Sequence, residues 1–161
     1  LCQGCYTCEQ RCPHGAIAMQ RREMPKTVRM DLKELDAAAI EALCRQARMN
    51  PEQVVCYCTE TRAEEVAAAI LAGARSPVDL SRMTGVRMGC SIECIQPQLR
   101  ILRAAGISPD PAKGWQYYAA SITVWDVPPD VENRYAHKGF HFREDARLLD
   151  EIANAPTGNG G

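Results

Sequence analysis

Eight of the nine cysteines in this 161-residue chain fall into two groups whose spacing suits metal binding. The first group is Cys2, Cys5, Cys8 and Cys12, and the second is Cys56, Cys58, Cys90 and Cys94. Thiolates are soft ligands that bind zinc and iron–sulfur clusters. The two groups therefore predict two metal centres. The ninth cysteine, Cys44, stands alone, and we expect it to be a small buried hydrophobic side chain.

The first group has the spacing C-x2-C-x2-C-x3-C and is followed directly by Pro13. Three thiolates at intervals of three residues along a turning loop can converge on one cubane cluster. Disulfides would have to join cysteines that are only three or four residues apart, and four-thiolate zinc sites normally come as two separated pairs. Residues 2–19 resemble one half of a bacterial two-cluster ferredoxin. The resemblance implies a [4Fe-4S] cluster on this segment.

The number of [4Fe-4S] clusters, one or two, stays open. In two-cluster ferredoxins the cysteine before the proline ligates the other cluster. Either Cys12 reaches a second cluster, or all four cysteines of the first group close on one. Because Leu1 opens the chain with this motif already under way, we expect another motif upstream of it.

The second group reads C-x-C, then a long interval, then C-x3-C. Cysteines two apart in an extended chain point to the same side, so we expect Cys56 and Cys58 to form one half of a site. Cys90 and Cys94 would form the other half. The helices expected after Cys58 and near Pro97 would direct their N-termini at the site, which favours bound negative charge. Zinc and a second [4Fe-4S] cluster remain alternatives for four thiolates.

Residues 54–106 resemble the bacterioferritin-associated-ferredoxin (BFD) type of [2Fe-2S] domain. The resemblance rests on Val55-Cys56-Tyr57-Cys58, Ala72-Gly73-Ala74-Arg75-Ser76, Asp79-Leu80, Thr84-Gly85 and Gly89-Cys90. It implies two short helix–turn–helix units that hold one [2Fe-2S] cluster on Cys56, Cys58, Cys90 and Cys94. The family usually ends in C-x2-C, whereas this chain has one residue more between its last two cysteines.

The fold class expected is α+β and mainly α, in four regions. They are a ferredoxin-like cluster segment over 1–25, a linker helix within 26–53, the helical [2Fe-2S] domain over 54–106 and an aromatic-rich extension over 107–161. The expected elements are a strand at 16–19, a helix from Asp31 to 47, helices over 62–72, from Ser76 to Gly85 and from Pro97 to Gly106, a strand over 117–127, and a helix near 143–154.

Seven aromatic side chains fall in the last third of the chain. They are Trp115, Tyr117, Tyr118, Trp125, Tyr135, Phe140 and Phe142. So many aromatic side chains are difficult to bury in a short segment, so this region is expected either to wrap onto the cluster domains or to dock a partner subunit. His137 and His141 are four residues apart, but Gly139 between them would break a shared helix, so a solvated pair is expected.

The composition of the chain and its lack of catalytic motifs favour electron transfer as the function. The formal net charge of −1 excludes nucleic acid held mainly by charge, and no apolar run is long enough for a membrane span. No dinucleotide fingerprint, P-loop or catalytic triad is present. We expect a non-catalytic subunit of a cytoplasmic oxidoreductase complex, relaying single electrons between a partner, such as a flavoprotein dehydrogenase, and an acceptor. The alternatives are an iron or redox sensor and a metal-delivery protein with a labile cluster or zinc at the second site.

Overall fold

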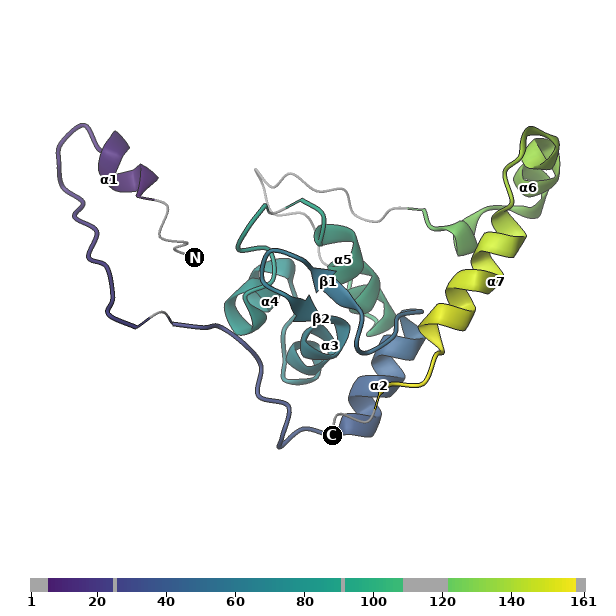
Figure 1. Cartoon of the computed structure of the whole chain (residues 1–161), viewed down its shortest axis with the longest axis horizontal. Helices are drawn as coiled ribbons and strands as arrows, with labels where there is room; N and C mark the ends of the chain where they lie inside the picture. Colours follow the sequence, from purple (N-terminus) through teal and green to yellow (C-terminus); the bar gives the residue numbers. More distant parts are fainter. Residues whose placement is uncertain (1–5, 25, 91, 109–121, 159–161) are drawn as a thin grey trace.

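A computed structural model describes residues 6–24, 26–90, 92–108 and 122–158. The protein is mainly helical, with a small antiparallel sheet of two strands (Figure 1), which confirms the expected fold class. The central elements are α2 (Ala37–Gln46), β1 (Val54–Cys56), β2 (Thr61–Arg62), α3 (Ala63–Leu71), α4 (Pro77–Thr84) and α5 (Ile95–Ala104). The flanking elements are α1 (Thr7–Arg11), η1 (Val124–Asp126), α6 (Pro129–Tyr135), η2 (Ala136–Lys138) and α7 (Phe142–Ala153).

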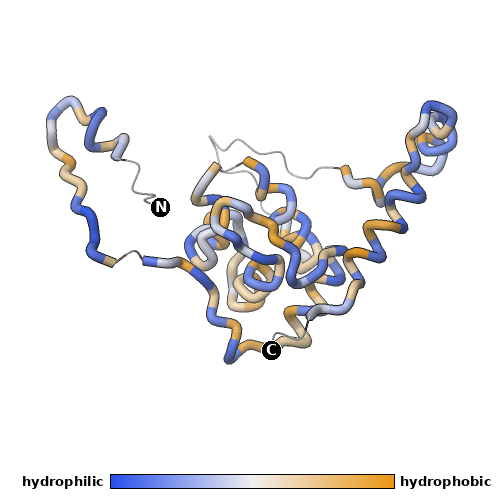
Figure 2. Tube along the Cα trace, in the orientation of Figure 1, coloured by the Kyte–Doolittle hydropathy of each residue, from blue (hydrophilic) through white to orange (hydrophobic). Residues whose placement is uncertain are grey.

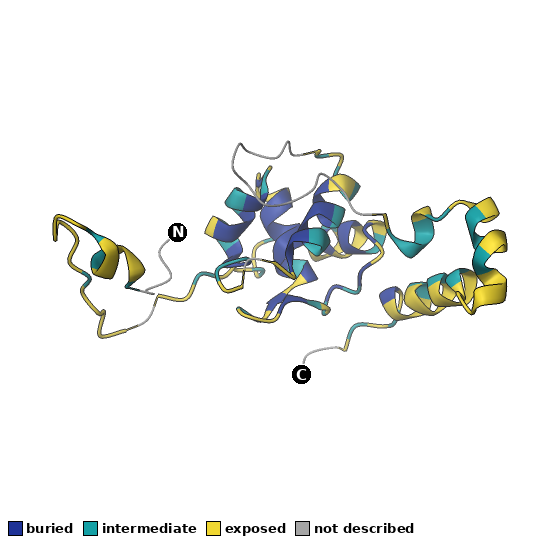
Figure 3. Ribbon diagram, turned by 90° about the horizontal axis from the view of Figure 1, so that it is seen from above, coloured by how far each residue is buried: buried dark blue, intermediate teal, exposed yellow. Residues whose placement is uncertain are grey.

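The core forms around α3, which contacts α2, α4 and α5. Ala67, Ala68 and Ala69 of α3 are fully buried. Because alanine side chains are short, the neighbouring helices can approach α3 closely. Larger side chains fill the remaining space, and those with no exposed surface are Met49, Val66, Leu80, Val86, Ile101 and Leu102. Figure 3 shows that burial is concentrated in this central unit and falls off toward both ends of the chain.

The ends of α4 are where the sequence predicts them. The Ser76 side chain accepts a hydrogen bond from the Asp79 N–H at 3.2 Å, and Pro77 occupies the first helical position. Gly85 ends the helix in the left-handed conformation, with φ 77°. Serine satisfies a free N–H at the start, and glycine adopts positive φ without a Cβ clash. The sequence therefore determines α4 locally.

The linker helix was predicted to begin at Asp31, and that prediction is wrong. Asp36 is the cap of α2, because its carboxylate accepts from the N–H groups of Ala38 and Ala39 at 3.0 and 3.1 Å. Leu32 and Leu35 still pack against the core, although they lie outside the helix. Their apolar spacing matched a helical stripe, but an irregular segment buries them equally well.

The two strands predicted outside the central unit are also corrected. Residues 16–19 are irregular and have no neighbouring strand in the described part of the chain, so no sheet forms there. In the predicted strand over 117–127, residues 117–121 lie outside the described residues, and Val124–Asp126 forms the 3-10 turn η1. Asp126 accepts hydrogen bonds from the N–H and O–H of Thr123, a local pattern that favours a turn. The sequence analysis missed α6, whereas α7 coincides with the predicted last helix.

The end of α7 is fixed to the central unit. The Arg45 guanidinium donates to the carbonyls of Ala153 and Ala155, and the Asn50 amide donates to Ala155 at 3.0 Å. Polar and apolar residues alternate along the rest of α7 (Figure 2).

No helix of the described residues has the length and apolar character needed to cross a bilayer.

Replacing Gly85 by alanine is expected to destabilise the protein by about 1–3 kcal/mol, because an L residue is strained at positive φ. In addition, a Cβ at Gly85 would lie 2.9 Å from the Val28 carbonyl oxygen. Gly106 has φ 73° and nothing within 4 Å of such a Cβ. Gly106→Ala is therefore the matched control, with an expected cost of about 1 kcal/mol. Denaturant unfolding of both variants measures the difference, and equal losses would contradict the close contact with Val28.

Candidate iron–sulfur site

The four cysteines of the second group come from two loops of the central unit. Cys56 is the last residue of β1, and Cys58 lies in the turn that leads to β2. Cys90 lies in the loop after α4, and Cys94 immediately precedes α5. Cys56 and Cys94 are 2% and 1% exposed, whereas Cys58 and Cys90 are exposed. The group therefore has a buried half and a surface half.

The thiols form two pairs, and each pair takes one cysteine from each loop. The Cys94 side chain influences the pKa of Cys56, and the Cys58 side chain influences that of Cys90. The Cys90 N–H also donates to Cys58 Sγ at 3.4 Å. The prediction that Cys56 and Cys58 form one half of the site stays a prediction, although the strand geometry on which it was based is absent. The extended chain ends at Cys56, so the alternation of a strand does not continue to Cys58.

In the buried pair, the two thiols differ in how readily they ionise. Burial opposes ionisation of Cys56, but hydrogen bonds from the Thr59 side chain and from the N–H groups of Arg87 and Thr59 leave its pKa below the usual value. Burial, followed by the nearby charge of Cys56, raises the pKa of Cys94 to about 12. A bound metal deprotonates its thiol ligands, so cluster assembly would displace the Cys94 proton.

In the exposed pair, backbone amides favour the thiolate. The N–H groups of Ile92 and Glu93, and then the Cys58 thiol, lower the pKa of Cys90. The helix α5 begins at Ile95, so its N-terminus lies beside the site, as the sequence predicts. Amide donors and a helix N-terminus both stabilise negative charge. This environment suits a thiolate-ligated cluster.

Two features of the backbone bring the loops of the site close together, and the first is at Gly89. A Cβ at Gly89 would lie 2.6 Å from Cys58 Sγ and even closer to Cys58 Cβ. Only glycine lets this loop approach Cys58 so closely. The other is Arg87, which is held at φ 70° and directs its N–H toward the Cys56 thiol. Non-glycine residues at positive φ are uncommon and concentrate at functional sites.

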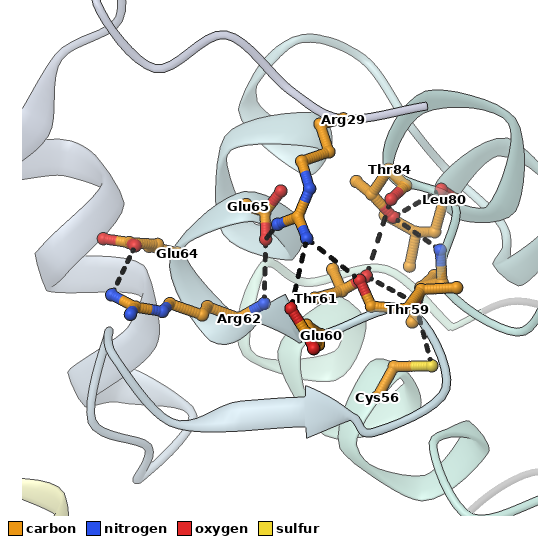
Figure 4. A network of polar contacts seen from close by, with 11 residues as sticks. Arg29, Cys56, Thr59, Glu60, Thr61, Arg62, Glu64, Glu65, Leu80 and Thr84 are labelled. Atoms are coloured by element: carbon orange, nitrogen blue, oxygen red, sulfur yellow. Dashed lines mark hydrogen bonds and ion pairs between the residues drawn. The ribbon is translucent and has the colours of Figure 1, made fainter. Parts of the chain in front are cut away.

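A polar network supports the loop that carries Cys56 (Figure 4). The Thr59 hydroxyl lies 3.1 Å from Cys56 Sγ and 2.8 Å from the Thr61 hydroxyl. Arg29 donates to the Thr59 carbonyl at 3.3 Å and to Glu65 at 3.4 Å. Glu65 is almost buried and also accepts from the Arg62 N–H at 2.9 Å. The sequence analysis missed Thr59, although a hydroxyl so close to the C-x-C motif was a possible signal.

Replacing Thr59 by valine is expected to lower the reduction potential of the cluster by tens of millivolts. The hydroxyl stabilises negative charge on Cys56 Sγ, and the reduced cluster carries more of it. Thr59→Ser keeps the hydroxyl and is expected to restore the potential. Redox titration monitored by EPR measures both variants. An unchanged potential in Thr59→Val would show that the Thr59 hydroxyl does not act on the cluster.

The first group is only partly described. Cys2 and Cys5 lie outside the described residues. Cys8 lies in α1 and is exposed, and Cys12 follows that helix. Cys12 Sγ accepts the Ala16 N–H at 3.3 Å, and the amides of Ala16 and His14 lower its pKa. The [4Fe-4S] motif at residues 2–19 stays a prediction.

The remaining candidates stand apart from both groups. Cys44 is completely buried in the core, which confirms that it is a small buried side chain, and burial raises its pKa to about 12. Gly139, between His137 and His141, has φ 83° and ends η2, so no helix aligns the two imidazoles. Across the described ranges, no three His, Cys, Asp or Glu side chains are placed to hold a single metal ion.

Comparison with known proteins identifies one part of the chain. No curated protein and no solved structure gave a match. Residues 54–104 match the family described as BFD-like [2Fe-2S] binding domains. The match covers all four cysteines of the second group, together with α3, α4 and α5. It confirms the resemblance over this part of the chain and supports iron–sulfur cluster binding by residues 54–104.

Proposed function

We propose that this chain is an iron–sulfur electron-transfer component of a larger oxidoreductase. It would relay single electrons between a flavin or another redox centre on a partner subunit and an acceptor. The observation that carries the proposal is the arrangement of the second cysteine group as two pairs, one buried and one exposed. We assign Cys56, Cys58, Cys90 and Cys94 as the ligands.

The donor set fits a [2Fe-2S] cluster. Each iron of such a cluster takes two thiolates, and the structure supplies two thiol pairs. A zinc site would instead need four thiolates around one point. The bound cluster supplies reversible one-electron chemistry.

The buried and exposed sides of the site have different roles in the proposed electron transfer. Cys56 and Cys94 keep one side of the site away from water, while the Thr59 hydroxyl and the Arg87 amide stabilise charge on Cys56. Cys58 and Cys90 face the surface, which gives a redox partner close access. Two apolar neighbours are also exposed at this edge, Tyr57 at 80% and Ile92 at 69%. A small apolar surface around an exposed edge suits transient contact with a redox partner.

We also propose that the first cysteine group binds a second cluster. We assign Cys2, Cys5, Cys8 and Cys12 to a [4Fe-4S] cluster, on the strength of their spacing and of the N–H bond to Cys12. A second cluster would extend the electron path beyond the BFD-like domain. Replacing Cys8 and Cys12 by alanine should then reduce the iron content while leaving the [2Fe-2S] EPR signal intact. Unchanged iron content would contradict this assignment.

Anaerobic purification of the full chain with its natural partners tests the proposed function. The expected result is a brown protein with equal iron and acid-labile sulfide, a [2Fe-2S] EPR signal after reduction, and a co-purifying flavoprotein or metalloenzyme. Reduction of that partner by its substrate should bleach the cluster. Zinc without sulfide at the second group would overturn the proposal in favour of a metal-delivery protein.

A further inference from the structure

A second polar site lies away from the cysteines, between the C-terminal ends of α2 and α5 and the turn η1. A hollow of about 330 Å³ opens there. Three arginines line it, Arg48 from the turn after α2 and Arg100 and Arg103 from α5, and Trp125 and Asp126 of η1 complete it. The electron-transfer proposal uses none of these residues, so the hollow needs a separate explanation.

Positive charge is concentrated in this hollow. The guanidinium carbons of Arg48 and Arg100 lie 5.0 and 5.2 Å from the centre of the Trp125 ring. Arg100 is held in place by donating to the carbonyls of Ala47 and Arg48 at 3.0 and 2.9 Å. Burial and the charge of Arg48 lower the pKa of Arg100, so the two cations are close enough to oppose one another.

The nearby carboxylates do not balance these cations. Asp126 lines the hollow, and its carboxylate already accepts two hydrogen bonds from Thr123. Asp150 of α7 pairs with Arg48 at 3.2 Å, on an exposed face. Three guanidinium groups therefore face one lining carboxylate. Crowded guanidinium groups are the usual means of binding phosphate or carboxylate groups.

The indole N–H of Trp125 does not take part in the hollow. Its Nε1 atom is buried and has no hydrogen-bond partner in the described part of the chain. Buried N–H groups are almost always paired, so this donor is an exception; because the atom has no accessible surface, a ligand in the hollow would not reach it. The three arginines therefore set the chemistry of the hollow, and a ligand there must be small and negatively charged.

We propose that this hollow binds a small, multiply charged oxyanion. The guanidinium groups of Arg48, Arg100 and Arg103, which line the hollow, would neutralise it and donate to its oxygens. The volume is at the lower end of the range for small-molecule sites, so a polyphosphate or polycarboxylate metabolite fits the hollow better than a dinucleotide. Because α5 begins beside Cys94 and carries Arg100 and Arg103, the ligand would contact the helix that also borders the cysteine site.

Titration of the anaerobically purified full chain tests the site, with pyrophosphate and citrate as separate probes. Isothermal titration measures affinity, and tryptophan fluorescence in a Trp115→Phe background reports on Trp125. At least one probe should bind and change the Trp125 emission. Arg103→Gln should weaken binding at least tenfold, because it removes one of the three guanidinium groups that line the hollow. The preferred probe distinguishes phosphate from carboxylate ligands.

The matched control is Arg147→Gln, which removes one exposed arginine of α7 outside the hollow. It should leave the affinity for either probe within twofold of the wild type. Absence of binding by both probes, or equal losses in Arg103→Gln and Arg147→Gln, would overturn the proposal. In either case the three arginines and Trp125 would only attach η1 to α2 and α5. Cluster content serves as the check that each variant is folded, and it does not depend on the outcome at this hollow.

Discussion

Replacing Cys56 or Cys94 by alanine is expected to abolish the [2Fe-2S] cluster. These residues form the buried thiol pair, and we assign both to one iron. An iron that loses a thiolate inside the protein has no water nearby to take its place. The visible absorbance and the EPR signal of the reduced protein should both disappear, and iron and sulfide should fall by the content of one [2Fe-2S] cluster.

Cys44→Ala is the matched control for these two variants. Cys44 is equally buried, and the same atom is removed, but the residue lies in α2 within the core. The Cys44→Ala variant should have a lower free energy of unfolding than the wild type, while its full [2Fe-2S] signal remains. If Cys56→Ala or Cys94→Ala kept a normal cluster while the protein stayed folded, the assignment of the ligands would be wrong.

Replacing Gly89 by alanine is expected to remove most of the cluster without altering any ligand. The added methyl group would occupy space that Cys58 already fills, because the new Cβ would lie 2.6 Å from Cys58 Sγ. Cys58 would have to move, and the exposed thiol pair would then be too distorted to hold iron. Iron content and EPR after anaerobic reconstitution measure the loss.

Gly158→Ala controls for the substitution of glycine by alanine. The nearest atom to a Cβ at Gly158 is Glu52 Oε1 at 3.8 Å, an ordinary contact, and neither glycine has the positive φ that would strain alanine. Gly158→Ala should therefore load the cluster as the wild type does. Full cluster content in Gly89→Ala would show that the loop moves aside easily and that Cys58 does not depend on the glycine.

The features that the sequence predicted are those that depend on a few neighbouring residues. Ser76, Pro77 and Gly85 determine the ends of α4 through the hydrogen bonds and the φ angle they favour. Cysteine spacing likewise located the second group, because thiolates so close in sequence have few structural uses. The match of residues 54–104 to a cluster-binding family agrees with both inferences.

The features that the sequence did not predict depend on contacts between distant segments. The pairing of Cys56 with Cys94 joins the end of β1 to the residue just before α5, and no local pattern records this. Thr59 is a common residue in a turn, and only the fold brings its hydroxyl to Cys56. The start of α2 was misplaced because two aspartates five residues apart are equally good caps by composition.

The two thiol pairs have a mechanical consequence because each pair joins the loop before α3 to the loop before α5. A cluster bound by both pairs closes the chain between them into a ring, much as two nested disulfides would. Cross-links of this kind restrict the unfolded chain and so favour the folded state. Loss of iron would open the ring and free the ends of α3 and α4 together, so the integrity of this domain would depend on its metal supply.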